Sequence, residues 1–336
     1  MPARITPLIT CLMLDTRNLW PGQKIDDAAS DVLQLLDPEE QRKARGMLQI
    51  KDARMVVASA LIKRYYISKT LGIPWKSILF GRRPDPVHGK PCYLPEDGSE
   101  SPIEFNVSHQ AGIVVLVGCE RSEAELGVDI VCVNERDDYR IIDSEGLNGW
   151  VNMFEQFFSP EEVWDMSYNV DTFQLLDGVD ITPDELGRHD RCCTRGRELT
   201  VDLKNGQQRT FNSDLLIDAK LRRFYTFYCH KEAYIKLTGE AMLADWLQEL
   251  EFRNVRSPKP GTVARCSTHG RWGEKANDVE VWLHGRRVED VKMEIQAFEE
   301  DFMISIAARP ASKFEGEDMP TFQNISVEDI ISVGTS

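Results

Sequence analysis

Two long segments repeat apolar residues every three or four positions, which is the spacing of an amphipathic helix. The first occupies residues 38–72 and the second residues 221–237, where aromatic residues gather on one side. Each is predicted to form a helix with one buried face. A shorter helix is predicted to begin at Ser159-Pro160, because Ser159 can cap it, Pro160 suits the first helical position and Glu162 completes a capping box.

Shorter apolar segments, several of them alternating with polar residues, predict β-strands. Two of them form a hairpin whose connection holds Ser108, His109 and Gln110, so these side chains are expected at an edge or mouth. The turn dipeptide Asn205-Gly206 predicts a second hairpin. The predicted strands are residues 77–80, 103–107, 113–119, 126–133, 199–203, 208–211, 247–252, 279–283, 291–297 and 302–308.

The order of these elements predicts an α+β protein. A polar link ending near residue 124 separates an N-terminal lobe, residues 1–124, from a C-terminal lobe, residues 125–312, in which a helix packs on an antiparallel sheet. Residues 166–221 are polar and weakly periodic, and we interpret them as an insertion. Residues 313–336 are expected to form a loosely attached tail, because periodicity is lost until residue 325.

The composition narrows the function classes. No run approaches the ~20 apolar residues that span a bilayer, and residues 1–10 lack the apolar core of a secretory signal, so no membrane partner and a cytoplasmic location are expected. Eight cysteines without paired spacing read as reduced thiols. The net charge of −15 argues against nucleic-acid binding. An anionic substrate would therefore need a local cluster of cations.

Such clusters are present, and Lys51 and Arg54 form one of them. If a helix begins near Lys51, these cations need an anion to offset the helix dipole; if the helix begins at residue 38, they are an ordinary solvated face. Other clusters hold Lys63, Arg64, Arg82, Arg83, Lys90, Lys220, Arg222 and Arg223.

Two segments place an acidic residue beside apolar positions that are expected to be buried. They are Gly127-Val128-Asp129-Ile130 and Lys231-Glu232-Ala233-Tyr234-Ile235-Lys236. Two carboxylates held in this way suit Mg²⁺, which binds one or two carboxylates and keeps sites for water and phosphate. Taken singly, Asp129 could simply end a strand, and Glu232 with Lys236 could be a surface pair contributing only ~0.3–0.5 kcal/mol.

Together with other motifs in the same order, these segments resemble the 4′-phosphopantetheinyl transferases of the Sfp type. Within that type, the chain resembles the eukaryotic enzymes that act on aminoadipate-semialdehyde dehydrogenase. The additional motifs are Lys51-Asp52-Ala53-Arg54, His88-Gly89-Lys90-Pro91 and Phe105-Asn106-Val107-Ser108-His109-Gln110. The resemblance covers residues 40–130 and 223–255.

This resemblance implies a fold of two similar α/β lobes related by a pseudo-twofold axis. Each lobe would pack a helix on a small, mainly antiparallel sheet, with the active site at the lobe interface. The implied activity is that of a holo-[acyl-carrier-protein] synthase. A carrier-protein serine attacks the β-phosphate of coenzyme A, takes the phosphopantetheine arm and releases adenosine 3′,5′-bisphosphate, with Mg²⁺ bridging the pyrophosphate.

By the same resemblance, Asp129 and Glu232 are the metal ligands, and Glu232 or a metal-held water is the base. Lys236 is expected to neutralise a phosphate oxygen, and Lys231 to do so less directly. The expected catalytic residues are thus Asp129, Glu232 and Lys236.

The remaining expected coenzyme A contacts lie in the first half of the chain. Ser108 and His109 would bind a phosphate, most naturally the 3′-phosphate, and Lys51, Arg54 and Lys90 would add positive charge around the nucleotide. The expected partners are apo carrier domains of fatty-acid, polyketide and nonribosomal-peptide synthases or of aminoadipate reductase. Two lobes joined in one chain favour a monomer.

The sequence also departs from the family pattern. Val131 stands where many members carry a further acidic residue, Tyr228 replaces a usual Trp, and Asp85 replaces an Arg found in a related enzyme. These departures leave open a non-catalytic coenzyme A or nucleotide-binding protein. A protein scaffold is a third alternative, but it leaves the clustered motif residues unexplained.

Overall fold

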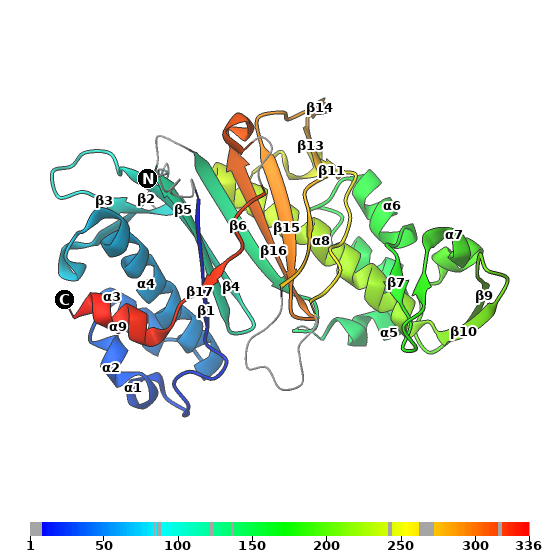
Figure 1. Cartoon of the computed structure of the whole chain (residues 1–336), viewed down its shortest axis with the longest axis horizontal. Coiled ribbons are helices and arrows are strands. Elements are labelled where there is room, and N and C mark those ends of the chain that lie inside the picture. The colour runs from blue at the N-terminus through cyan, green and yellow to red at the C-terminus, as the bar shows by residue number, and fades with distance from the viewer. Residues whose placement is uncertain are drawn as a thin grey trace, which may run out of the picture.

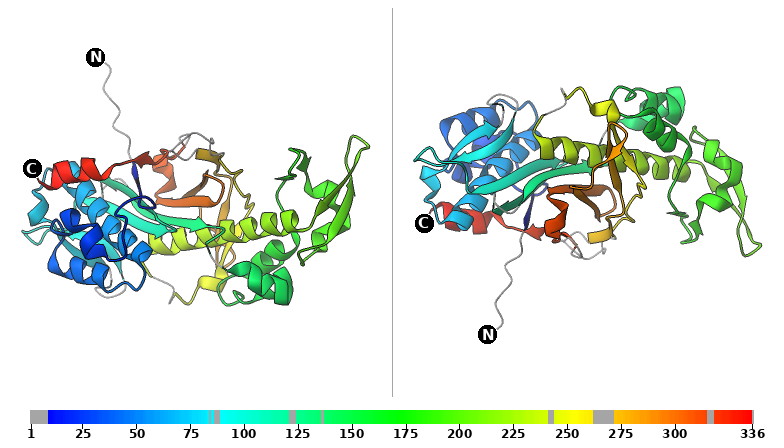
Figure 2. Two further views of the ribbon diagram at one scale, coloured as in Figure 1. Left: turned by 90° about the horizontal axis from the view of Figure 1, so that it is seen from below. Right: turned by 90° about the horizontal axis from the view of Figure 1, so that it is seen from above.

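The computed structural model describes residues 9–83, 85, 89–120, 124–135, 137–240, 244–261, 272–314 and 318–335. The molecule is elongated, with the N-terminal helices at one end and residues 166–221 at the other (Figure 1, Figure 2). It is an α+β protein with several small, mainly antiparallel sheets, which confirms the predicted class. His88 of the predicted motif and Cys266 lie outside the described residues.

The first sheet has the strand order β17-β1-β5-β4. Strands β4 and β5 form the predicted hairpin, closed by Ala111-Gly112 with positive φ angles of 48° and 86°. Because β4 runs further than predicted, Ser108, His109 and Gln110 lie in the strand itself, at the sheet edge, rather than in the connection. The strands are β1 (Thr10–Asp15), β4 (Ile103–Gln110), β5 (Ile113–Glu120) and β17 (Gln323–Asn324).

The second sheet has the order β12-β15-β16-β6. Strand β6 directly follows β5 in the chain, yet it pairs antiparallel with β16 along its whole length, from Glu125↔Arg309 to Cys132↔Phe302. The chain thus passes from the first sheet to the second between β5 and β6. The strands are β6 (Glu125–Cys132), β12 (Trp272–Ala276), β15 (Lys292–Phe298) and β16 (Phe302–Arg309).

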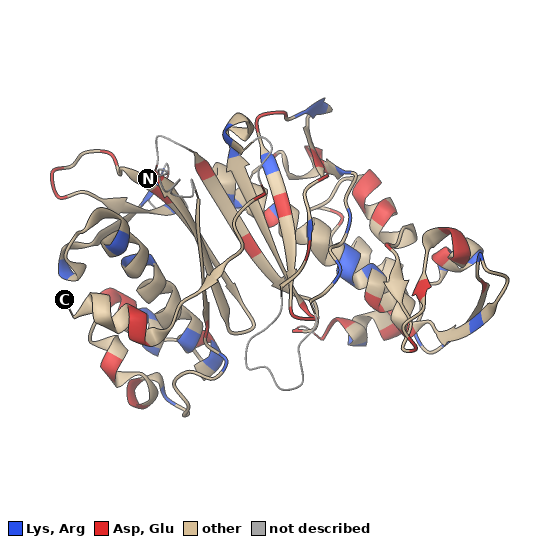
Figure 3. Ribbon diagram, viewed as in Figure 1, with Lys and Arg blue, Asp and Glu red and all other residues tan. Residues whose placement is uncertain are grey.

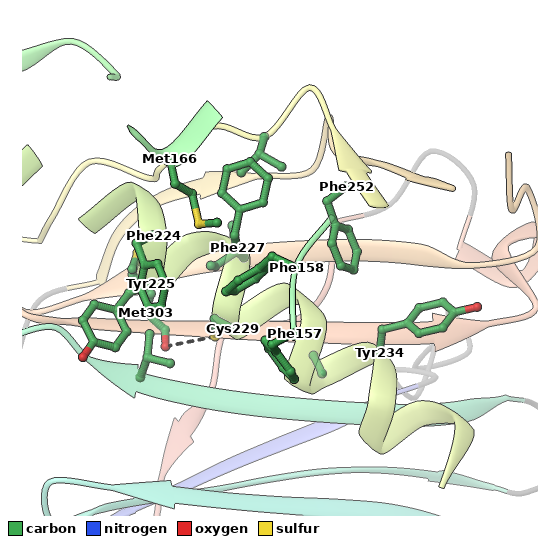
Figure 4. Packing of buried hydrophobic residues seen from close by; sticks show 14 of the residues in the cluster. Phe157, Phe158, Met166, Phe224, Tyr225, Phe227, Cys229, Tyr234, Phe252 and Met303 are labelled. Carbon is green, nitrogen blue, oxygen red and sulfur yellow. Dashed lines mark hydrogen bonds between the residues drawn. The ribbon is translucent and has the colours of Figure 1, made fainter. Parts of the chain in front are cut away.

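One long helix covers each sheet: α4 (Ile50–Leu71) packs on β4 and β5, and α8 (Asp214–Thr238) packs on β6 and β16. Aromatic side chains gather around α8, as predicted from its sequence (Figure 4). Along β6 the pleat sends Val131 toward α8 and its neighbours Ile130 and Cys132 into a different core, so Asp129 shares the α8 side.

The segment predicted as one helix over residues 38–72 is two helices. A capping box at Asp37 begins α3 (Pro38–Arg45), the chain leaves the helix at Gly46, and α4 begins at Ile50. Lys51 is therefore in the first turn of a helix, which answers the question that the sequence left open.

Residues 166–221 form a small appendage around the first half of α8, with its own apolar core (Figure 1). The predicted hairpin around Asn205-Gly206 is confirmed: β9 (Glu198–Asp202) pairs antiparallel with β10 (Gln208–Asn212). The buried Lys220 ammonium fastens the appendage to α8 by donating to backbone carbonyls of Ser167, Asp190 and Cys192. Helix α6 (Pro160–Tyr168) leads into the appendage, whose other elements are β7 (Phe173–Gln174), β8 (Asp180–Ile181) and α7 (Pro183–Leu186).

The expectation of a loosely attached C-terminal tail is wrong for the described residues beyond 312. Strand β17 pairs parallel with β1, and α9 (Val327–Gly334) packs on α4 with Ile330 fully buried. Phe322 enters a core shared by both sheets. This segment covers an otherwise open strand edge, which explains its apolar residues.

The remaining elements complete the two halves. Among the described residues, no helix has both the length and the apolar character that crossing a bilayer requires. The additional elements are α1 (Ile25–Ala28), α2 (Ser30–Leu33), β2 (Leu79–Arg83), β3 (Lys90–Leu94), α5 (Asp138–Asn152), β11 (Leu250–Arg253), β13 (Glu280–Leu283) and β14 (Arg286–Arg287).

Candidate active site

The two sheets meet where the edge strands β4 and β6 lie side by side (Figure 1). Side chains at alternate positions of β4 bridge this seam. Asn106 Oδ1 accepts from Val128 N at 3.1 Å, and Gln110 Oε1 accepts from Cys132 N at 3.2 Å. Between them, Ser108 Oγ donates to Asp129 Oδ1 at 2.9 Å. The Phe-Asn-Val-Ser-His-Gln motif is thus a row of contacts between the two sheets.

Asp129 lies at the centre of a small polar cluster. Lys236 Nζ, from α8, is 2.6 Å from Asp129 Oδ1 and 2.8 Å from Ser108 Oγ. The Asp129 side chain is nearly buried, whereas 29% of the Lys236 side chain remains exposed. A carboxylate, a hydroxyl and an ammonium from three separate elements therefore converge at one point.

This cluster lines a cavity of about 320 Å³ that opens between α4, the seam and α8. Glu232 lines the same cavity, one helical turn before Lys236, so the two carboxylates predicted as ligands face a common space. Tyr228 is also in the wall. The complete lining is Asp52, Met55, Ser108, His109, Gln110, Asp129, Ile130, Glu135, Tyr228, Glu232 and Lys236.

His109 stands at the mouth of this cavity. Its outer surface is exposed, yet the walls around the ring desolvate an imidazolium, and this lowers the pKa of His109. The positive charges of Lys236 and Lys43 lower the pKa further. Lys43 was not predicted as a site residue. Its place in the last turn of α3, next to the helix break, brings its charge near His109.

Lys51 and Arg54 lie beside the cavity rather than in its wall. Lys51 Nζ is 3.9 Å from Glu135 Oε1, across the cavity mouth, and about half of its side chain is exposed. The Arg54 guanidinium donates to the Trp20 carbonyl at 3.1 Å. Lys51 is thus available to an anion at the cavity mouth. The Arg54 side chain is instead held by the backbone at Trp20.

Lys90 lines a different cavity, of about 540 Å³, together with Arg82, Arg83 and Arg309. Its ammonium is 2.6 Å from Glu104 Oε1 and donates to the Leu237 carbonyl at 3.1 Å. Burial lowers the pKa of Lys90 to about 8. Because Glu104 is at the start of β4 and Ser108 near its end, the structure separates Lys90 from the Asp129 cluster along the seam.

Lys231 is placed away from both cavities. Its ammonium is fully buried and donates to Glu162 Oε2 at 2.8 Å, to the Phe157 carbonyl at 2.9 Å and to the Leu247 carbonyl at 3.1 Å. Burial lowers the pKa of Lys231 and raises that of Glu162, while each charge opposes the shift in the other. With all of these partners inside the protein core, Lys231 is not proposed as a coenzyme A contact. Its role is to hold α6 on α8.

Gly127 allows the helix that carries Glu232 and Lys236 to approach β6. A Cβ at this position would meet the Ala233 carbonyl oxygen and lie 2.5 Å from Leu237 N. Both contacts are with backbone, which moves only if α8 itself moves.

We therefore expect Gly127→Ala to lower the free energy of unfolding by about 1–3 kcal/mol. It should also reduce activity, because α8 is displaced. Urea denaturation measures the first effect. Gly46→Ala is the control, since a Cβ there has ordinary contacts and φ is −75°. Equal effects of the two substitutions would show that close packing at Gly127 is unimportant.

His230, left unassigned by the sequence, is a buried structural residue. Its Nδ1 is 3.0 Å from Ser305 Oγ, and the ring stacks on Phe252 with centroids 5.7 Å apart. Burial lowers the pKa of His230 from 6.5 to about 3.

The folded state therefore resists protonation that the unfolded chain accepts. Between about pH 6.5 and 3 the unfolded chain binds a proton at this residue and the folded state does not, so stability is lost as pH falls. We expect the slope of unfolding free energy against pH to decrease in His230→Asn by up to ~1.4 kcal/mol per pH unit in this window. Denaturant titrations of parent and variant at several pH values measure it, and parallel curves would contradict it.

The carboxylates in the cavity fit a Mg²⁺ ion that takes only part of its ligands from the protein. Asp129 and Glu232 supply carboxylates to one cavity, and the described residues contain no group of three or more His, Cys, Asp or Glu that could hold a metal. Val131, where many family members carry an acidic residue, packs in the core beside α8. Two carboxylates with positions left for water and phosphate oxygens are the coordination that Mg²⁺ prefers.

Comparisons with known proteins identify the family of this chain. A family model described as 4′-phosphopantetheinyl transferase, N-terminal, matches residues 23–121. A 4′-phosphopantetheinyl transferase of Aureobasidium melanogenum is 58% identical over 326 residues, which cover 96% of both chains. This chain belongs to the 4′-phosphopantetheinyl transferase family. It is accordingly a transferase, and the resemblance inferred from the sequence is confirmed.

More distant relatives extend the comparison. The 4′-phosphopantetheinyl transferase A of Aspergillus fumigatus is 32% identical, covering 91% of this chain and 84% of that protein. An L-aminoadipate-semialdehyde dehydrogenase-phosphopantetheinyl transferase of Xenopus laevis is 35% identical over 97 residues, 29% of this chain and 30% of that protein. The similarity to the transferases of fungi thus spans nearly the whole chain, insertion included.

Proposed function

We propose that this transferase moves the 4′-phosphopantetheine arm of coenzyme A to a serine of apo carrier-protein domains, with Mg²⁺ as cofactor. The observation that supports this most directly is the convergence of Asp129, Ser108 and Lys236 beside Glu232 in one cavity. Carboxylates suit a metal, and an ammonium with a hydroxyl suits phosphate oxygens. A pyrophosphate needs both kinds of partner at once.

The chemical step forms one bond and breaks one. The serine Oγ of the carrier forms a bond to the β-phosphorus, and the bond from that phosphorus to the bridging oxygen breaks, so adenosine 3′,5′-bisphosphate leaves. The serine proton passes to Glu232 or to a water beside it. Lys236 neutralises charge on the phosphate oxygens and on the leaving group. When bound at Asp129 and Glu232, Mg²⁺ would supply further positive charge to the pyrophosphate.

The cations around the cavity mouth define the nucleotide end of the proposed complex. His109 donates to a phosphate, Ser108 does so when its hydroxyl hydrogen turns away from Asp129 Oδ1, and Lys51 and Lys43 add positive charge there. Lys90 belongs to the other cavity and is assigned to the nucleotide only by the family motif. Such a local concentration of cations allows an anionic substrate to bind although the chain as a whole is acidic.

The proposal also covers the symmetry of the two halves, the oligomeric state and the cellular location. We propose that the two halves are related by an approximate twofold axis, since each packs one long helix on a four-stranded sheet. Because both halves belong to one chain, the protein is proposed to act as a monomer. The cysteines of the described residues are free thiols, which suits a cytoplasmic location.

The test is an intact-mass measurement of a purified apo carrier domain incubated with coenzyme A and Mg²⁺. The expected result is a gain equal to one phosphopantetheine group, located on a serine and absent when Mg²⁺ is chelated. Tight coenzyme A binding without any gain on fatty-acid, polyketide, nonribosomal-peptide or aminoadipate-reductase carriers would instead identify a non-catalytic binding protein. That alternative is consistent with Val131 and Tyr228.

A further inference from the structure

An aromatic pair lies on the outer face of α6. Trp164 is 58% exposed, and its ring lies against that of Tyr168 one turn later, with centroids 5.7 Å apart. The opposite face of the helix is buried: Met166 lies in the core beside α8, and Glu162 forms its ion pair with Lys231 there. Helix α6 is therefore anchored on one face and presents a large aromatic surface to solvent on the other.

The charge of the surrounding segment limits what this face can bind. Residues 141–187 contain eleven acidic residues and no Lys, Arg or His, in a chain with 55 acidic and 40 basic residues. Accordingly, α6 and α7 carry Asp and Glu but neither Lys nor Arg (Figure 3). Single exposed apolar residues are common on protein surfaces. An exposed Trp within a segment that lacks cations, however, repels nucleic acid and anionic lipid and attracts basic partners.

Glu161 adds a carboxylate beside the exposed indole. It precedes Trp164 by three residues, so the two side chains are neighbours on the helix surface. Glu161 is exposed and has no ion pair within the part of the chain that the structure describes. The charge of Glu161 reaches Arg253, but that guanidinium is 2.6 Å from Glu251 Oε1 and stacks over Trp282, 4.0 Å from the ring centroid. Glu161 and Trp164 together are thus open to a cation from outside.

We infer that the outer face of α6 is a docking surface for a basic segment of a partner protein. An Arg or Lys of the partner lies over Trp164 and pairs with Glu161. Arg fits better, because a planar guanidinium stacks on an indole and still donates two hydrogen bonds to a carboxylate. Neither residue lines the cavity that holds Asp129, so this surface is separate from the candidate active site and goes beyond the proposed function.

The probe is a fluorescein-labelled peptide in which Arg alternates with Gly, and fluorescence anisotropy follows its binding to the full-length protein. The parent should bind this peptide, and the same peptide with citrulline in place of Arg should not bind. Trp164→Ala should raise the Kd at least ~5-fold, because the guanidinium loses its aromatic face. Leu176→Ala is the control: Leu176 is 94% exposed in the same cation-free segment, and its loss should leave the Kd unchanged.

Glu161→Lys and Asp184→Lys distinguish this site from general attraction between opposite charges. Both residues are acidic, each directly follows a Pro in the first turn of its helix, and both belong to the cation-free segment. The two reversals therefore change the net charge equally. Glu161→Lys should raise the Kd at least ~10-fold, and Asp184→Lys less than ~2-fold. Equal effects of the two reversals, or no binding of the peptide by the parent, would overturn the inference.

A second copy of this chain is the alternative occupant, because residues 42–54 hold five cations and a single acidic residue. Analytical ultracentrifugation tests this alternative. Dimers that dissociate in Glu161→Lys but not in Asp184→Lys would assign the surface to self-association and overturn the inference of a separate partner. A monomeric parent, with parental transferase activity in every variant of this surface, would support it.

Discussion

Asp129→Asn should lower the rate of phosphopantetheine transfer by at least ~10²–10³-fold, as expected when a preorganised electrostatic group is removed from a reacting phosphate. The substitution keeps the size of the side chain and removes its charge. Lys236 then loses the carboxylate that lies 2.6 Å away, and the cavity loses one of its two proposed ligands for Mg²⁺.

The protein should remain folded. Lys236 keeps contact with water through its exposed part, so breaking its ion pair with Asp129 should change the free energy of unfolding by no more than about 1 kcal/mol. Single-turnover assays followed by carrier mass, together with urea denaturation, measure both quantities. Asp184→Asn, on the exposed first turn of α7, is the control that should leave both unchanged. Near-parental transfer by Asp129→Asn would remove this carboxylate from the mechanism.

Lys231→Met should show the opposite pattern: a large loss of stability with little loss of activity per folded molecule. The substitution leaves Glu162 buried without its cation, and removing one partner of a buried ion pair typically costs about 3–5 kcal/mol. Glu162 Oε2 would keep its bond from Ser159 N, and Oε1 its bond from Phe252 N, but the carboxylate would have no positive partner.

A double-mutant cycle with Glu162→Gln tests this explanation. The double variant should be less destabilised than the sum of the single variants, because neither buried charge then remains without a partner. The KM for coenzyme A should stay within a few-fold of the parent value in every variant that folds. A rise in this KM of ten-fold or more in Lys231→Met, with parental stability, would return Lys231 to the coenzyme A site.

The different fates of Lys231 and Lys236 follow from helical geometry. Adjacent residues of a helix point about 100° apart, whereas residues four apart share a face. Lys236 therefore accompanies Glu232 into the cavity, and Lys231 points into the core. Helical spacing predicts the first placement, but the partner of Lys231 lies in another helix, α6, and no local pattern connects Glu162 with it.

The elements predicted most accurately are those with strong local signals. The capping box at Ser159 begins α6 as predicted, and Asn205-Gly206 closes its hairpin. The sequence leaves two starts open for the helix that carries Lys51, residue 38 or a position near Lys51, because apolar periodicity alone does not mark the break at Gly46. The docking of residues 323–334 was missed because β17 and α9 pair with β1 and α4, more than 250 residues earlier, and such long-range partners leave no short-range pattern.

The sequence identifies the candidate site residues, but it does not show which of them line the same cavity. Asp129, Ser108, His109, Glu232 and Lys236 meet in one cavity, as the motifs imply. Lys90 lies at the other end of the seam, and its position depends on how β3 packs against β4, which no motif specifies.

We propose that Asp129 and Glu232 hold one divalent ion beside the pyrophosphate of coenzyme A. Electron paramagnetic resonance with Mn²⁺ in place of Mg²⁺, titrated with coenzyme A present, tests it directly. We expect one bound Mn²⁺ in the parent protein and in the control Asp184→Asn, and weakened binding in both Asp129→Asn and Glu232→Gln. Parental Mn²⁺ affinity in either of these last two variants would contradict it.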